Sequence, residues 1–250
     1  MIAKAVPVCL ALTAGLVAYG PAAAQPAPSA QDIVRRADEA RFPQEGFEVL
    51  VNIKTLQSGR VREERVFKVL SKGNENSVVM TLEPASERGQ ILLMKARDLW
   101  MFLPRVSQPV RLSLAQRLVG QVSNGDIARA NFAGDYNAKL LGTAMLGRET
   151  VYVLDLTAVD RSVTYQRVRY WVSQSSFRPQ RAEFYSLSDR LLKTCEYTDY
   201  KTLGNKVRPT KLLMTDALNK GEQSTLDYTA LKLRDLPDHI FSKEYLRRLE

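Results

Sequence analysis

Residues 90–96 (QILLMKA) and 99–103 (LWMFL) are two apolar segments separated by Arg97 and Asp98. Odd and even positions of both segments are apolar, so a strand here buries both of its faces. We assign four side chains to one face of the pair: Leu92, Met94, Trp100 and Phe102. The opposite face then has five: Ile91, Leu93, Leu99, Met101 and Leu103. A strand that is buried on both sides of an antiparallel sheet needs a cover on each face, either a helix or an apolar cavity.

The sequence around this pair predicts a long antiparallel sheet and a mainly β fold with a few helices. From Gly46 to Leu233 the chain shows roughly eleven alternating segments in a row, many of them bounded by turn residues. Ser58-Gly59 is typical of a hairpin turn. The predicted strands begin with residues 47–53, 60–71 and 78–82, and continue after the apolar pair with 140–145, 150–157, 164–173, 179–187, 191–200, 209–216 and 222–233.

The N-terminal residues have the pattern of an export signal. Lys4 precedes an apolar run over residues 6–17, and Ala22 to Ala24 form a small-residue cleavage site, which predicts a mature chain from Gln25. The alternative is a retained N-terminal anchor, but the run is shorter than the ~20 residues of a membrane span. We therefore predict a periplasmic protein with a signal peptide (1–24), a linker and helix (25–45) and a single β domain (46–250).

The overall charge favours anionic partners. The chain has 36 Lys and Arg residues against 27 Asp and Glu residues, a net charge of +9. Residues 1–24 contain one charged side chain, Lys4, so the predicted mature chain carries +8. In a periplasm the nearest anionic surfaces are lipid headgroups. Export argues against nucleic acid as a partner, and we predict peripheral contact with membranes.

The residues that carry chemistry are scarce. His239 is the chain's only histidine, and Cys195 is the only cysteine after the predicted signal peptide. Zinc and iron sites use clustered histidines and cysteines, so we predict no metal and no cofactor. A Ser-His-Asp arrangement would have to use His239, and no G-x-S-x-G motif occurs. We predict a non-catalytic protein, with a lipid hydrolase as the weakest alternative, and a buried Cys195.

Residues 104–136 interrupt the alternation for more than 30 residues, a length typical of lids and binding loops. Two short helices are predicted here, over residues 114–119 and 126–131, with Asp126 as N-cap of the second. Arg105, Arg111 and Arg117 are predicted to contact phospholipid headgroups or a partner, because arginine binds phosphate through two hydrogen bonds. The alternative is a solvated loop with scattered arginines.

Apolar and aromatic side chains of several predicted strands suggest a hydrophobic cavity for acyl chains, although such side chains also form ordinary cores. The predicted lining consists of Leu92, Met94, Trp100, Phe102, Tyr152, Leu154 and Trp171.

Two stretches carry a family resemblance. Residues 89–113, GQILLMKARDLWMFLPRVSQPVRLS, resemble the signature of the LolA-like outer-membrane lipoprotein-sorting family. Residues 170–201, YWVSQSSFRPQRAEFYSLSDRLLKTCEYTDYK, are similar to a later family stretch, and the resemblance spans about 47–241. Residues 124–136 (NGDIARANFAGDY) depart from the family's usual loop but retain Phe132, which we add to the predicted lining.

The resemblance implies a half-open, curved antiparallel sheet, an incomplete barrel with helices covering its concave face. The space between sheet and helices would be a hydrophobic cavity. It also implies a periplasmic carrier of lipid or lipoprotein acyl chains for transfer between membranes. The alternative is a non-catalytic binding module of an RND-type exporter in the inner membrane, which would have a collapsed cavity and an exposed apolar patch.

Overall fold

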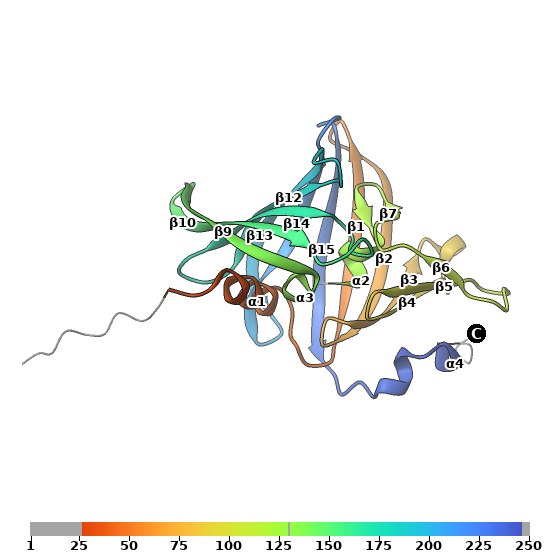
Figure 1. Ribbon diagram of the computed structural model, residues 1–250. Coiled ribbons are helices and arrows are strands. Elements are labelled where there is room, and N and C mark those ends of the chain that lie inside the picture. Colours follow the sequence, from red (N-terminus) through yellow and green to blue (C-terminus); the bar gives the residue numbers. More distant parts are fainter. Residues whose placement is uncertain (1–26, 130, 247–250) are drawn as a thin grey trace, which may run out of the picture.

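A computed structural model describes residues 27–129 and 131–246 (Figure 1). The predicted signal peptide, with cleavage after Ala24, lies outside these residues. Thirteen strands form one antiparallel sheet in the order β6-β5-β4-β3-β2-β1-β15-β14-β13-β12-β11-β10-β9, and β7 pairs with β8 separately. The predicted fold class is confirmed: the chain is mainly β, and its large sheet is not closed into a barrel.

The described elements follow one another along the chain with short turns between most of them. The strands are β1 (Phe47–Gln57), β2 (Arg60–Lys72), β3 (Asn76–Glu83), β4 (Ile91–Lys95), β5 (Asp98–Phe102), β6 (Val110–Leu112), β7 (Arg117–Val119), β8 (Val122–Ser123), β9 (Tyr136–Leu146), β10 (Glu149–Ala158), β11 (Arg167–Ser173), β12 (Pro179–Tyr185), β13 (Leu191–Leu203), β14 (Lys206–Asp216) and β15 (Glu222–Leu233). The α-helices are α1 (Ala30–Arg41), α2 (Asn124–Ala128), α3 (Phe132–Asp135) and α4 (Lys243–Leu246), and the 3₁₀ helices are η1 (Ala85–Glu87) and η2 (Asp238–Phe241). None of the helices in the described part of the chain is long and apolar enough to cross a membrane.

Strand β1 shows how the alternating sequence builds the concave core. Phe47, Val49, Val51 and Ile53 are buried, and the residues between them are partly exposed. The strand ends at the predicted Ser58-Gly59 turn, where both residues have positive φ. A two-residue hairpin turn of this kind matches the twist of the flanking strands. On the other side of the core, α1 begins at the N-cap Ser29 and buries Ile33, Val34 and Ala37.

The register of β4 and β5 corrects the predicted faces of the apolar pair. Leu92 pairs with Met101 and Met94 with Leu99, whereas Leu93 pairs with Trp100. The turn between the strands has two residues, so an even-numbered residue of β4 lies opposite an odd-numbered residue of β5, and paired residues share a face. Our assignment of Trp100 and Phe102 to the face of Leu92 and Met94 is therefore wrong.

Both faces of this pair are covered, as its composition predicts. Leu92, Met94 and Leu99 belong to the main concave core. Ile91, Leu93 and Phe102 form a second core on the convex face with the C-terminal segment, which contributes Leu236, Ile240, Phe241 and Leu246. The ammonium group of Lys243 lies 3.9 Å from the centre of the Trp100 ring. The residues after Pro237 form η2 and α4, which cover the convex face.

The segment between β6 and β9 departs from the two helices predicted for it. Residues 117–119 are the strand β7, which turns at Gly120 into β8, so the predicted helix over residues 114–119 is wrong. Gly120 has φ +52°, and a Cβ there would lie 2.3 Å from Thr55 Oγ1. A glycine thus lets this turn touch β1. Helix α2 starts at Asn124, and Asp126 is not its N-cap but accepts a 2.8 Å hydrogen bond from Ser123 N.

Candidate functional site

The concave face of the sheet is covered by α1, α3 and α2, which lie next to one another across it (Figure 1). Residues 113–129 and 131–135, here named the crossing segment, run over this face from β6 to β9. Four cavities lie between the crossing segment and the strands, with volumes of about 360, 20, 100 and 20 Å³. The crossing segment forms one wall of each cavity. It contributes Gln121 and Ser123 to the cavity of about 360 Å³, and Gln116 and Asn124 to the cavity of about 100 Å³. It contributes Gly125 and Phe132 to one cavity of about 20 Å³, and Ile127 and Ala128 to the other.

Five of the eight predicted lining residues lie on the concave side of the sheet. Leu92, Met94 and Leu154 are buried in the main core, and Phe132 and Tyr152 pack against it. Leu92 lines the cavity of about 100 Å³, and Phe132 lines one of the two small ones. In this structure the predicted acyl-chain cavity is filled and divided rather than continuous.

The other three predicted lining residues, Trp100, Phe102 and Trp171, do not lie on the concave face. The first two lie under the C-terminal segment on the convex face. Trp171 pairs with Val153 and has the guanidinium of Arg181 5.4 Å above its ring. Its neighbours Tyr170 and Val172 are fully buried in the concave core, so alternation turns Trp171 outward.

The three predicted headgroup arginines do not meet at one site. Arg105 is exposed in the turn after β5, and Arg111 forms an ion pair with Asp98 on the surface. Arg117 lines the cavity of about 360 Å³, where the second arginine is Arg190. Sequence reasoning missed Arg190, because it lies in a turn between β12 and β13 that carries no binding motif.

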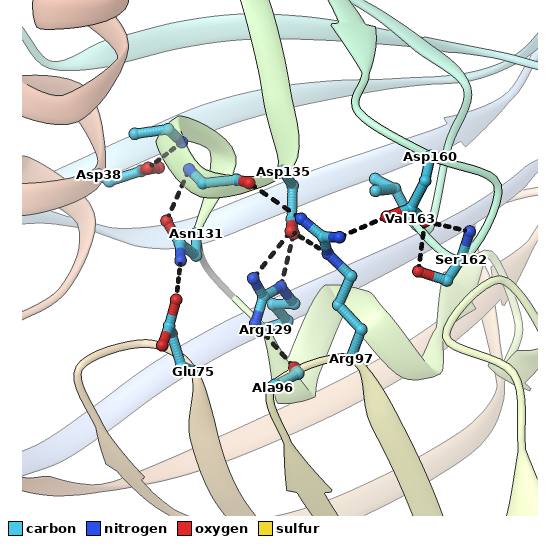
Figure 2. A network of polar contacts seen from close by, with 12 residues as sticks. Asp38, Glu75, Ala96, Arg97, Arg129, Asn131, Asp135, Asp160, Ser162 and Val163 are labelled. Carbon is cyan, nitrogen blue, oxygen red and sulfur yellow. Dashed lines mark hydrogen bonds and ion pairs between the residues drawn. The ribbon is translucent and has the colours of Figure 1, made fainter.

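A buried ion-pair network fastens α3 and the end of α2 to the sheet (Figure 2). Arg129 donates two hydrogen bonds to Asp135, at 2.5 and 2.8 Å, and a third to Ala96 O at 2.8 Å. Arg97 donates to Asp135 and to Gly134 O, both at 3.0 Å, and pairs with Asp160. The Arg129 and Asp135 side chains are 4% and 6% exposed, so these charges depend on each other for compensation.

Asp38 of α1 holds the start of α3. Its Oδ2 accepts a 2.8 Å hydrogen bond from Ala133 N, and its other oxygen has no hydrogen-bond partner among the described residues. Burial raises the pKa of Asp38 to about 7, although the charge of Arg41, 3.9 Å away, acts in the opposite direction. The Arg41 guanidinium also lies 4.9 Å from the centre of the Phe132 ring.

A third polar contact fastens α2 to β13. Lys193 Nζ lies 2.7 Å from Asp126 Oδ2 and also donates to Gln121 O. Tyr165 donates a 2.8 Å hydrogen bond to the same Asp126 oxygen. A close approach adds to this fastening, since a Cβ on Gly125 would lie 2.0 Å from Thr164 Oγ1. The crossing segment is thus held on the sheet by buried charges at both of its helices.

One signal for these buried charges is present in the sequence, at Lys193. Lys193 alternates in β13 with Cys195 and Tyr197 on the same face of the strand, and both of these residues are buried. Burial raises the pKa of the Cys195 thiol to about 12, so it is a protonated core side chain. Within residues 27–129 and 131–246, no three His, Cys, Asp or Glu side chains lie close enough together to hold a metal ion.

Comparisons with known proteins agree with this architecture. A family model described as "Uncharacterized protein" matches residues 73–248, and no curated protein matches the chain. The crystal structure of a LolA superfamily protein from Nitrosomonas europaea is 59% identical, with a TM-score of 0.83, over 88% of this chain and 100% of that one. The chain belongs to the LolA superfamily. The resemblance read from residues 89–113 and 170–201 is therefore confirmed.

Two more distant solved structures share the fold. A DUF1329 family protein from Desulfovibrio piger is 24% identical, with a TM-score of 0.74, over 87% of this chain and 97% of that one. A putative outer membrane lipoprotein-sorting protein domain from Vibrio parahaemolyticus is 19% identical, with a TM-score of 0.75, over 88% of this chain and 98% of that one.

Proposed function

We propose that this LolA superfamily protein is a non-catalytic periplasmic carrier that binds acyl chains of a lipid or lipoprotein between its sheet and the crossing segment. The observation that carries the proposal is the shared wall of the four cavities. If the crossing segment moves off the sheet, we expect the four separate spaces to join into one cleft along the concave core, because the segment is the wall that they share. The similarity to a LolA superfamily protein, and to a domain described as lipoprotein-sorting, supports the same reading.

In this proposal the crossing segment is a lid, and the structure shows its closed form, in which polar contacts hold the lid on the sheet. Buried ion pairs add little net stability over apolar packing, but they hold one specific arrangement. The concave core beneath is apolar, with Leu92, Met94 and Leu154 facing it. Each CH₂ group transferred from water contributes about 0.8 kcal/mol, so an acyl chain of ordinary length can offset the loss of these contacts. We propose Leu92, Met94, Phe132, Tyr152 and Leu154 as the ligand-contacting set.

A disulfide between α2 and the loop before β11 tests whether the lid must move. The ideal Cβ of Gly125 lies 3.0 Å from the Cβ of Thr164, and a disulfide needs about 3.8 Å, so a small shift accommodates G125C/T164C. We expect the oxidised variant to bind a fluorescent fatty acid at least about tenfold more weakly than the same variant after reduction. Cys195 does not interfere, because it is buried. Equal binding by the oxidised and reduced forms would exclude a site under the crossing segment.

A wedge at the same position is expected to have the opposite effect. In Gly125→Val the new side chain collides with Thr164, so α2 is lifted and the open form becomes more populated. Apparent affinity for the fluorescent fatty acid should rise roughly tenfold, since it scales with the fraction of open protein. The double variant G125V/T164G makes room for the valine and should return toward the wild-type affinity. A wedge that weakens binding in a folded protein contradicts the lid.

A second candidate is the binding module of a membrane exporter, which the filled cavity and the edge strand β9 favour. Leu140, Leu141 and Met145 of β9 are exposed, and exposed edge strands pair readily with partner chains. Gln31 of α1 bonds the backbone of Tyr136 and Ala138, which covers the first part of this edge only. Absence of fatty-acid binding in the wild type, the wedge and the reduced disulfide variant together would favour this candidate. An RND-type exporter as the partner stays a prediction.

A further inference from the structure

Three hairpin turns meet at one end of the sheet, the top of Figure 1. Ser58 N donates to Gly221 O at 2.9 Å, which joins the β1–β2 turn to the β14–β15 turn. Ala217 N donates to Leu192 O at 3.0 Å, which joins the β14–β15 turn to the start of β13, next to the β12–β13 turn. We name this end the tip surface and define it by Arg60, Arg62, Arg117, Leu187, Arg190, Leu218 and Lys220.

The tip surface exposes large apolar side chains. Leu218 is 79% exposed and Leu187 is 70% exposed, more than any other large apolar residue in the described part of the chain. Leu187 lies in the turn between β12 and β13, and Leu218 lies in the turn between β14 and β15. Single exposed leucines are common, but two on adjacent turn tips form a patch that suits an apolar environment.

The charge around these leucines is positive. No ion pair within the described residues involves the five basic side chains of the tip surface. Two neighbouring acids form ion pairs: Asp189 pairs with Arg167 at 2.8 Å, and Glu63 pairs with Arg65 at 2.8 Å. Asp216 and Glu222 accept hydrogen bonds from uncharged groups only, so five basic side chains stand against these two carboxylates.

The cavity of about 360 Å³ lies at this end of the sheet, and its lining combines the same two chemistries. Arg117 and Arg190 lie at it together with Leu191, Leu218 and one carboxylate, Asp216. Lys193, deeper in the lining, is neutralised by Asp126. Free guanidinium groups beside leucines match a surface that is anionic outside and apolar within, as a bilayer with acidic phospholipids is.

We propose that the tip surface docks on an anionic phospholipid bilayer. Leu187 and Leu218 enter the interface, the basic side chains contact headgroup phosphates, and the cavity beside them faces the membrane. The docking explains how cargo reaches the cleft, and in that respect it rests on the proposed function. The excess of positive charge over the whole chain, +9, strengthens the same attraction.

Co-sedimentation with lipid vesicles tests the docking. The probe is vesicles of phosphatidylcholine with 30% phosphatidylglycerol, and the protein starts at Gln25, so that the apolar run 6–17 does not bind lipid by itself. We expect binding to these vesicles, at least about tenfold weaker binding to pure phosphatidylcholine, and loss of most binding in 0.5 M NaCl, where charges are screened within a few ångströms. A wild-type protein that does not bind the anionic vesicles overturns the proposal.

Matched variants locate the surface. L187S/L218S should weaken binding to the anionic vesicles about tenfold or more, whereas L140S/L141S, on the exposed edge of β9, should not change it. R117E/R190E should weaken it far more than K139E/R148E, which changes net charge equally on β9 and the turn after it. Equal losses in the paired variants would mean that overall charge or general stickiness, rather than the tip surface, binds the lipid.

A second readout separates this inference from the carrier function. Leu187 lines none of the cavities described above, so L187S should bind the soluble fluorescent fatty acid like the wild type while binding vesicles more weakly. Vesicle binding that depends on Leu187 in a protein that takes up no fatty acid leaves the docking intact and removes the carrier. Fatty-acid uptake with vesicle binding that is insensitive to Leu187 does the reverse.

Discussion

Asp135→Ala is expected to lower the free energy of unfolding by about 3–5 kcal/mol, the usual result of removing one partner from a buried ion pair. Asp135 accepts two hydrogen bonds from Arg129 and one from Arg97. Without the carboxylate, the Arg129 guanidinium, 4% exposed, keeps its charge in the core with only Ala96 O as a partner. Urea denaturation measures the loss, and the same variant should bind the fluorescent fatty acid more tightly because α3 is released.

The control is Asp98→Ala, which breaks the surface pair with Arg111, where both side chains are about half exposed or more. Exposed pairs contribute about 0–1 kcal/mol, so this variant should unfold near the wild-type midpoint. R129M/D135L removes both charges and should recover much of the stability lost in Asp135→Ala. Similar losses for Asp98→Ala and Asp135→Ala would mean that the buried network does not fasten the crossing segment.

The sheet could be read from the sequence because its strands obey a local rule. Alternation in residues 47–53 marks the buried face, and the Ser58-Gly59 turn fixes the hairpin. Residues 90–103 are apolar at odd and even positions, which correctly predicted that both faces of this strand pair are covered. The C-terminal segment covers one of the two faces. Trp100 and Phe102 were placed on the wrong face because the length of a turn, not the composition of its strands, decides which residues become partners.

The crossing segment could not be read in the same way. Leu114 and Leu118 have helical spacing, but residues 117–119 form a strand because Gly120 lets the chain turn back against Thr55. The buried charges depend on contacts between residues far apart in the sequence, such as Arg97 with Asp135 and Lys193 with Asp126. Charged residues are mostly exposed, so the sequence alone places them on the surface.

Because buried charges hold the crossing segment on the sheet, it differs from an apolar lid in what closes it. An apolar lid over an apolar groove would compete with the cargo for the same surface. Here Lys193 of β13 pairs with Asp126, Arg97 of the β4–β5 turn pairs with Asp135, and Asp38 of α1 accepts a hydrogen bond from Ala133 N. The contacts that close the cleft are therefore largely separate from the surface that would bind an acyl chain.

Raising the pH from about 4 to about 8 is expected to weaken the folded state through Asp38. Its pKa is raised from 3.8 to about 7 by burial, so the folded protein holds this proton more tightly than the unfolded chain does. The stabilisation is fully present below pH 4 and is lost as the pH rises through 7. At about 1.4 kcal/mol per pKa unit, the shift corresponds to about 4 kcal/mol.

Other carboxylates act in the opposite direction but at lower pH. Ion pairs lower the pKa of Glu48 and Asp238, so their contribution is lost as the pH falls below the ordinary carboxyl range. Asp38→Asn isolates the effect, because its side-chain oxygen still accepts from Ala133 N and carries no charge. Measured between pH 5 and 8, the free energy of unfolding of D38N should increase relative to that of the wild type as the pH rises.

His239→Asn is the control for the titration of the chain's only histidine. If the difference in unfolding free energy between D38N and the wild type does not change with pH, Asp38 stays ionised and the prediction is wrong. If the difference follows the expected course, α3 is held least firmly at neutral pH, which favours release of the crossing segment under the conditions in which a carrier would load.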